Sequence, residues 1–96
     1  MQFQHYDLGN LTQGQTVEIR LQGNAANILL LDTNNFNRYR RGERYEYFGG
    51  HATTSLTRLP VPRTGHWHVA VDLGGYKGQV RALFPLRVGE YFHSTR

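Results

Sequence analysis

Hydrophobic and polar residues alternate along most of this chain, most regularly over residues 66–73. The positions of one face are Trp67, Val69, Val71 and Leu73, and those of the other are His66, His68, Ala70 and Asp72. A Thr64-Gly65 turn precedes this segment and Gly74-Gly75 follows it. The pattern predicts a half-buried strand, central in its sheet, with the single tryptophan, Trp67, in the core.

Other segments also have strand patterns. Residues 16–22 alternate and predict a strand with one wet face, whereas residues 26–31 carry apolar side chains on both faces and predict a strand covered on both sides. The remaining strand-like runs are residues 3–8, 44–48, 53–59 and 79–88. Pro85 removes a backbone donor, which favours an edge position for the last run. We expect Gly49-Gly50 to interrupt the chain as a loop or a bulge.

The period changes to that of a helix after residue 31. Asp32 or Thr33 is suited to cap its first turn, and Phe36 and Tyr39, three residues apart, are expected to face the sheet. Gly42 stands where a left-handed residue ends many helices. These signals predict one short helix near residues 34–41.

The expected fold is therefore all-β: a compact β-sandwich, or a partly open barrel, of about seven short strands with one short helix. The 96 residues suit a single domain over residues 1–96. Residues 90–96 are either a frayed tail or a segment that docks through its aromatic residues.

Composition narrows the possible chemistry. The chain has no cysteine, so disulfides, thiolate catalysis and cysteine-based zinc sites are excluded. The first residues show no signal-peptide pattern, and the longest apolar run, residues 25–31, is too short to span a bilayer. We therefore expect a cytoplasmic protein without membrane contact. The net charge of +4 attracts polyanions, although a small protein also needs charge to stay soluble.

Positive charge is densest just within and after the predicted helix. The candidate ligand- or phosphate-binding residues are Arg38, Arg40, Arg41, Arg44, Tyr45 and Tyr47. Guanidinium groups bind phosphates and carboxylates, and tyrosine rings offer stacking surfaces for bases. The competing interpretation is a solvated helix face, with the arginines paired to Glu43 and Glu46 and the tyrosines completing the core.

His66 and His68 project from the same face of one strand, about 7 Å apart. They are weak candidates for a metal site, which needs a third ligand from His51, His5 or Asp72. The alternative is a pair of solvent-facing or lightly packed histidines, so we expect no metal and no cofactor.

Signals for catalysis or for a phosphate-binding loop are weak. No G-x-S-x-G string is present, no nucleophile is paired by spacing with His68, and the glycine-rich stretches match no nucleotide-binding motif. Asp7, Asp32 and Asp72 each suit a turn or cap role. We expect no enzymatic activity.

Several strings together resemble a known family. They are GNAAN at 23–27 with LLD at 30–32, NFNRYRRG at 35–42 with YFGG at 47–50, and VPRTGHW at 61–67 with VDLGG at 71–75. They resemble the bacterial family DUF1883, a small domain of unknown function, over roughly residues 6–88. The resemblance implies a β-sandwich-like fold and, because the family also occurs beside Toll/interleukin-1 receptor type domains, an accessory or sensing module. It implies no catalytic residues.

Three functional hypotheses follow. The first is a non-enzymatic module that binds a small ligand or a protein partner as an accessory or sensing piece of a bacterial system. The second is a basic module that binds nucleic acid or a nucleotide through the arginines and tyrosines. The third is a homo-oligomeric structural domain that associates through its sheet edges.

Overall fold

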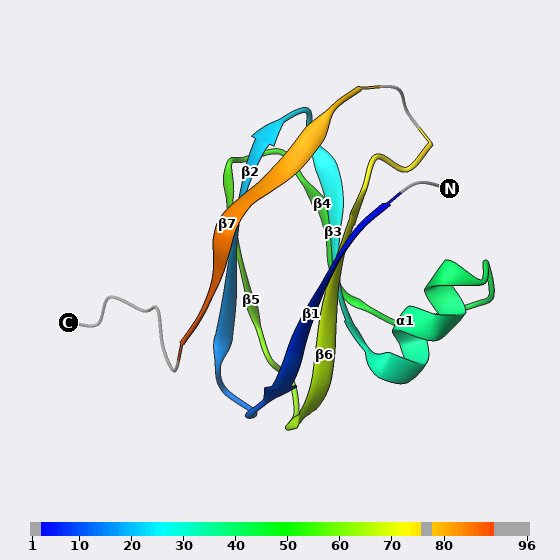
Figure 1. The fold of residues 1–96 in the computed structure, drawn as a ribbon, viewed down its shortest axis with the longest axis vertical. Helices are drawn as coiled ribbons and strands as arrows, with labels where there is room; N and C mark the ends of the chain where they lie inside the picture. Colours follow the sequence, from blue (N-terminus) through cyan, green and yellow to red (C-terminus); the bar gives the residue numbers. More distant parts are fainter. Residues whose placement is uncertain (1–2, 76–77, 90–96) are drawn as a thin grey trace.

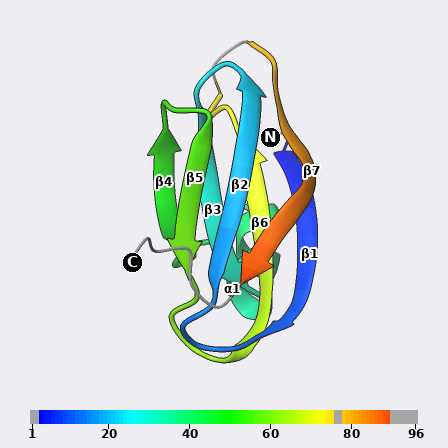
Figure 2. The same cartoon turned by 90° about the vertical axis from the view of Figure 1, so that its left-hand side faces the viewer.

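Two antiparallel sheets pack face to face, and one helix lies on the outer face of the larger sheet (Figure 1). The computed structural model describes residues 3–75 and 78–89. The larger sheet has the order β1 (Phe3–Leu11), β6 (Gly65–Asp72), β3 (Ala26–Asp32) and β4 (Phe48–Ala52). The smaller sheet has the order β5 (Leu56–Pro60), β2 (Thr16–Gly23) and β7 (Val80–Gly89), seen in front in Figure 2. These seven strands form a sandwich and no closed barrel, which confirms the predicted all-β class.

Strand β6 is central, as its alternation predicts. It pairs with β1 on one side and with β3 on the other, both antiparallel. Trp67 is 1% exposed and belongs to the core between the two sheets, together with Ile19 of β2 and Leu30 of β3. The inward positions of β6 therefore hold the two sheets together.

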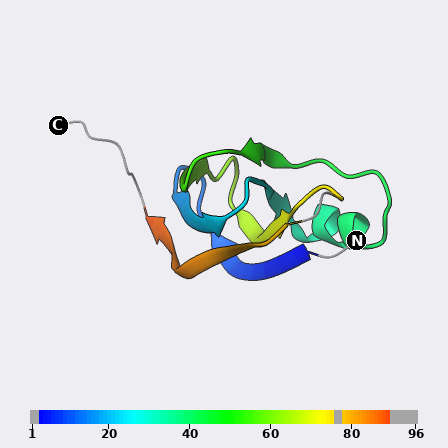
Figure 3. The same cartoon turned by 90° about the horizontal axis from the view of Figure 1, so that it is seen from above.

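A second apolar core lies between the larger sheet and the helix α1 (Thr33–Arg40), which sits on the side away from β2 and β7 (Figure 3). Phe36 and Tyr39 of α1 pack against Leu29 and Leu31 of β3, so the prediction that β3 is covered on both faces is confirmed. For β6 the prediction of a half-buried strand is wrong. Its second face is buried as well, at His68, Ala70 and Asp72, because α1 covers it.

The helix begins and ends where its sequence indicates. Asp32 is the N-cap, and its Oδ1 accepts a 2.8 Å hydrogen bond from the Asn35 amide. At the other end Gly42 adopts a φ of 76° and donates its amide to the Tyr39 carbonyl at 3.1 Å, while the Glu43 amide donates to the Arg38 carbonyl at 2.9 Å. This pair of bonds is a Schellman motif, which satisfies the last carbonyls of the helix.

The strand expected over residues 44–48 is misplaced. Residues 43–47 are neither strand nor helix, and β4 begins at Phe48 and runs through Gly49-Gly50, which we expected to interrupt it. At Gly49 the backbones of β4 and β3 approach so closely that a Cβ would lie 2.2 Å from the Ile28 carbonyl oxygen. Gly49 thus permits the close approach of the two strands. The next strand, β5, is also shorter than the predicted run, because it begins only at Leu56.

Two further details concern the other strands. The edge position predicted for the last strand is confirmed, because β7 pairs with β2 alone within the described sheets. The wet face predicted for β2 is wrong at Glu18, which is 3% exposed and accepts a 3.0 Å hydrogen bond from Arg58 Nε of β5. The tail predicted over residues 90–96 and part of the loop after Gly75 lie outside the described residues.

Candidate functional site

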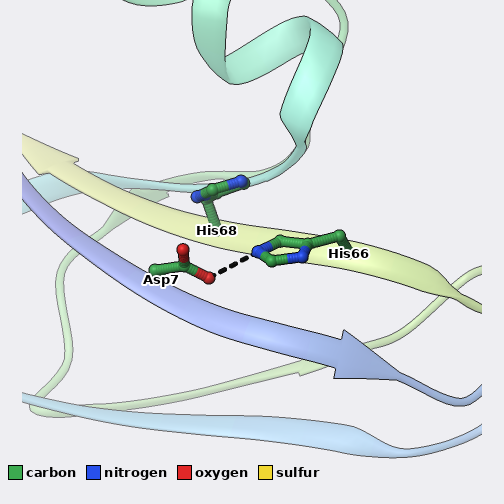
Figure 4. Close-up of side chains that lie close together, drawn as sticks. All are labelled: Asp7, His66 and His68. Carbon is green, nitrogen blue, oxygen red and sulfur yellow. Dashed lines mark hydrogen bonds and ion pairs between the residues drawn. The ribbon is translucent and has the colours of Figure 1, made fainter.

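A histidine–aspartate cluster lies on the outer face of the larger sheet, next to α1 (Figure 4). Asp7 of β1 stands opposite His68 of β6 in the strand register, and His66 projects from the same face of β6. His66 Nε2 and Asp7 Oδ1 are 2.6 Å apart. One potential ligand atom of each of the three residues lies within 4.8 Å of the others. Strand pairing therefore gathers two imidazoles and one carboxylate in a small volume.

His68 is the best-anchored member of this cluster. It is 6% exposed, and both of its ring nitrogens have neighbours: Nδ1 is 2.9 Å from His5 Nε2, and Nε2 is 2.9 Å from Thr33 Oγ1. The Phe36 ring of α1 stacks on both imidazoles, with centroid distances of 3.9 Å to His5 and 4.9 Å to His68. The helix thus packs against both rings and, through Thr33 as well, holds the buried His68 ring in place.

The surroundings shift the titration of the cluster in a consistent way. Burial lowers the pKa of His68 and also that of His5, so both rings favour the neutral form near pH 7. The Gly9 amide, which donates to Asp7 Oδ1 at 2.9 Å, and the neighbouring His66 lower the pKa of the Asp7 carboxyl. An ionised Asp7 carboxylate therefore lies close to the neutral rings of His5 and His68, whose nitrogens are donor atoms for a metal ion.

The sequence offers three residues as a third ligand for His66 and His68, and the structure places one of them, His5, beside His68. His5 does contact His68, but His51 lies beside Asn27, 3.4 Å from its Oδ1, and Asp72 is bonded to Tyr39 and Asn27. Asp7 was missed because its position opposite His68 depends on the register of β1 against β6, including a bulge after Asp7. The turn and cap roles predicted for the aspartates are confirmed by hydrogen bonds from backbone amides to Asp7, Asp32 and Asp72.

A pocket of about 250 Å³ lies between α1 and the segment that follows it. Its lining residues are polar or charged apart from one tyrosine: Asp32, Asn34, Asn35, Arg38, Arg44, Tyr45 and Glu46. Asn35 fixes its shape, because its side-chain oxygen accepts the Glu46 amide at 2.8 Å and its side-chain nitrogen donates to Asp32 at 3.0 Å. The chain after the helix is thereby tied back to the helix N-terminus.

The predicted arginine and tyrosine cluster divides between this pocket and the surrounding surface. Arg38, Arg44 and Tyr45 line the pocket. The other predicted residues are outside the lining: Arg40 donates from Nε to Asn37 at 3.1 Å, Arg41 pairs with Glu43 at 3.4 Å, and Tyr47 is 46% exposed. Sequence reasoning missed the contributions of Asn34 and Asn35, because an asparagine-rich helix start is equally consistent with capping alone.

The described strands and helix define a two-sheet antiparallel sandwich with one helix packed on its outer face. Comparison with protein families matches residues 1–87 to the domain of unknown function DUF1883. The chain belongs to this family, which confirms the resemblance seen in its sequence strings. The searches of curated proteins and of solved structures gave no match. Among the described residues, no helix has the length and apolar character needed to cross a membrane.

Proposed function

We propose that this domain is a non-enzymatic binding module that holds the phosphate or carboxylate group of a small ligand in the pocket beside α1. The observation that carries the proposal is the convergence of Arg38 and Arg44 on one pocket with Tyr45. Arg38 comes from the last turn of the helix and Arg44 from the segment after it, so the fold brings arginines from two segments to the lining of one pocket.

The charges around the pocket support an anionic ligand. Asp32, although it lines the pocket, has one carboxylate oxygen bonded to Asn35 and the other to Arg63, which offsets its charge. Glu46 remains as a further acidic group beside the two arginines. Guanidinium groups bind phosphate and carboxylate oxygens in a bidentate manner, and the tyrosine ring offers a flat surface beside them.

The dimensions favour a head group over a whole large ligand. Pockets for drug-sized molecules usually span about 300–1,000 Å³. At about 250 Å³ this pocket is slightly smaller. We therefore expect the anionic group of the ligand to enter between the arginines while the rest of the molecule lies against the surface.

The proposal is tested by adding inorganic phosphate, nucleoside monophosphates and small dicarboxylates to the untagged chain in a thermal-shift assay, followed by calorimetric titration. A ligand at a hundred times its Kd stabilises the folded state by about 2.7 kcal/mol. We expect the double variant Arg38→Ala/Arg44→Ala to lose this stabilisation. The matched control is Arg40→Ala/Arg41→Ala, which removes the same charge from outside the pocket and retains binding.

Equal losses in the two double variants would indicate diffuse electrostatic attraction and overturn the proposal. So would the absence of a shift with every anion. A response confined to nucleoside monophosphates would identify a nucleotide ligand, and a response to phosphate and dicarboxylates alike would identify a general anion site.

Self-association is a second candidate function, and one observation favours it. Strand β4 lies at an edge of the larger sheet, and Phe48 at its start is 43% exposed beside the exposed Tyr47. Unpaired edges with apolar side chains promote strand pairing between molecules. A concentration-dependent mass in analytical ultracentrifugation that disappears in Phe48→Lys would support it. The accessory or sensing role in bacteria and the cytoplasmic location stay predictions from the sequence.

A further inference from the structure

The histidine–aspartate cluster shares no residue with the pocket lining and supports a separate inference. Three of its donor side chains, Asp7 of β1 and His66 and His68 of β6, lie close together, and His5 of β1 has its Nε2 2.9 Å from His68 Nδ1. We propose that these four side chains form a binding site for a divalent transition-metal ion of the zinc type. Imidazole nitrogens and a carboxylate oxygen are ligands that Zn²⁺ uses in proteins.

The spacing of the donor atoms fits such an ion after small side-chain movements. Bonds of about 2.0–2.1 Å in a tetrahedral site place two ligand atoms about 3.4 Å apart. In the structure the His5–His68 nitrogens are 2.9 Å apart, His66 Nε2 and Asp7 Oδ1 are 2.6 Å apart, and the donor atoms of Asp7, His66 and His68 all lie within 4.8 Å of one another. Both measured pairs are closer than 3.4 Å, so the side chains must rotate to move these donor atoms apart by less than about an ångström.

The side chains that must rotate to bind the ion are the exposed ones. His5, Asp7 and His66 are exposed, whereas His68 is buried and fixed between Phe36 and Thr33. The backbone positions are set by antiparallel pairing of β1 with β6. A site with one fixed ligand and three adjustable ones on a rigid sheet needs no rearrangement of the fold.

Outer contacts orient the ligands in the way metal sites require. Ligating histidines usually donate the second ring N–H to an oxygen, and ligating carboxylates accept further hydrogen bonds. Thr33 Oγ1 lies 2.9 Å from His68 Nε2, which leaves Nδ1 directed at His5 and available to the ion. The Gly9 amide donates to Asp7 at 2.9 Å. Thus Thr33 of α1 supports a ligand from β6, and Gly9 of β1 supports a ligand from its own strand.

A cluster that serves only as an ion pair and a hydrogen-bond chain would have the same resting geometry. The two interpretations differ in their response to metal. Untagged protein is stripped with a chelator, dialysed, and titrated with Zn²⁺ by calorimetry and with Co²⁺ by visible absorption. We expect about one ion per chain with a Kd in the micromolar range or below, and the intense Co²⁺ bands typical of a tetrahedral site.

The ligand assignment is tested by His66→Ala and Asp7→Asn, which change exposed side chains. Each should weaken binding by more than the roughly 10–100-fold typical of an outer partner, whereas Thr33→Val should weaken it by about 10–100-fold. His51→Ala is the matched control, since it removes an exposed imidazole on β4 at the far edge of the same sheet and should bind as the wild type does. Arg38→Ala/Arg44→Ala should also retain the metal.

The thermal midpoint of each variant, measured in chelator, shows whether the variant folds. Metal affinities are compared only among variants whose midpoint matches that of the wild type. Absence of Zn²⁺ and Co²⁺ binding to the wild type would overturn the proposal. Binding that survives both His66→Ala and Asp7→Asn would overturn it as well, because the ion would then be held elsewhere.

Discussion

The hydroxyl of Tyr39 donates a 2.5 Å hydrogen bond to Oδ2 of Asp72 and so ties the only described helix to the central strand. Both residues are buried, and the other oxygen of Asp72 accepts from Asn27 at 2.9 Å and from the Gly74 amide at 2.8 Å. A buried carboxylate is tolerated when its oxygens are hydrogen-bonded in this way. The same bond fixes α1, which covers the histidine cluster on one side and borders the pocket on the other.

The first prediction follows from this bond. Tyr39→Phe keeps the ring packed against Phe3 and Tyr45 but leaves Asp72 Oδ2 without its donor. A hydrogen bond to a charged group contributes about 1.5–3 kcal/mol, so we expect the free energy of unfolding in urea to fall by about that amount. Tyr47→Phe, at an exposed position, should change it by less than about 0.5 kcal/mol. Equal stability of the two variants would contradict the role given to the bond.

Alkaline pH gives a second prediction about Tyr39. Burial, and then the bond to Asp72, raise the pKa of the Tyr39 hydroxyl above its ordinary value. The unfolded chain therefore releases this proton at a pH where the folded chain keeps it. The resulting stability is complete below the unfolded pKa of about 10 and is lost as the pH rises above it. Between pH 9 and about pH 11, the free energy of unfolding in urea should decrease less for Tyr39→Phe than for the wild type. Burial also raises the pKa of Tyr6 and Tyr45, so part of the decrease should remain in the variant.

The two glycines of β4 provide a matched pair for the third prediction. Gly49 and Gly50 have φ values of 116° and 149°, so alanine is strained at both, by about 1–3 kcal/mol. Only at Gly49 does an added Cβ meet backbone, 2.2 Å from the Ile28 carbonyl oxygen, while at Gly50 nothing lies within 4 Å. Gly49→Ala should therefore destabilise the fold by more than about 3 kcal/mol and by clearly more than Gly50→Ala. Comparable losses in chemical denaturation would show that strain alone governs this strand.

The elements that could be predicted from sequence are those whose own residues contain the necessary information. The alternation around Trp67 and the apolar faces of residues 28–31 determine β6 and β3, since burial acts on the side chains themselves. The helix is equally local, because Asp32 and Gly42 supply its two caps.

The remaining features depend on what a segment meets in space. Residues 48–52 contain two glycines and no strand pattern, yet they form β4 because they fit closely along β3. His68 and Asp72 occupy the polar phase of their strand but are buried, because a helix from elsewhere in the sequence covers them. Asp7 joins the histidines only through strand register, and Arg38 meets Arg44 only because the chain turns back after the helix. Both candidate sites therefore required the structure.

The fourth prediction concerns Asp32, which has two separable roles. It caps α1 through the Asn35 amide, and it pairs with Arg63, whose guanidinium carbon lies 5.0 Å from the centroid of the Trp67 ring. Asp32→Ala removes both roles and should cost about 1–2 kcal/mol in unfolding free energy, mainly through the cap. Asp32→Asn keeps a good capping residue and loses only a half-exposed ion pair, so we expect less than about 1 kcal/mol. If the two substitutions cost the same, the ion pair and not the cap would be the main contribution.

Acidification gives the last prediction, which concerns the metal-free protein in chelator. Burial lowers the pKa of His68; His5 and His66 lower it further, whereas Asp7 and Asp32 oppose the shift. The unfolded chain, with a histidine pKa near 6.5, therefore binds protons at a higher pH than the folded chain does. It follows that the free energy of unfolding is highest above about pH 6.5 and falls as the pH is lowered through that value.

Urea denaturation at about pH 7.5 and pH 5 measures this loss, and this window excludes the aspartates, whose ordinary pKa is near 3.9. His68→Gln, which retains hydrogen-bonding groups towards Thr33 and His5, should reduce the loss. The exposed His5→Gln should reduce it in part, because burial also lowers the pKa of His5. If the free energy of unfolding were the same at the two pH values, the pKa of His68 would not be lowered in the folded state. The charge of Asp7 would then compensate for the burial of protonated His68.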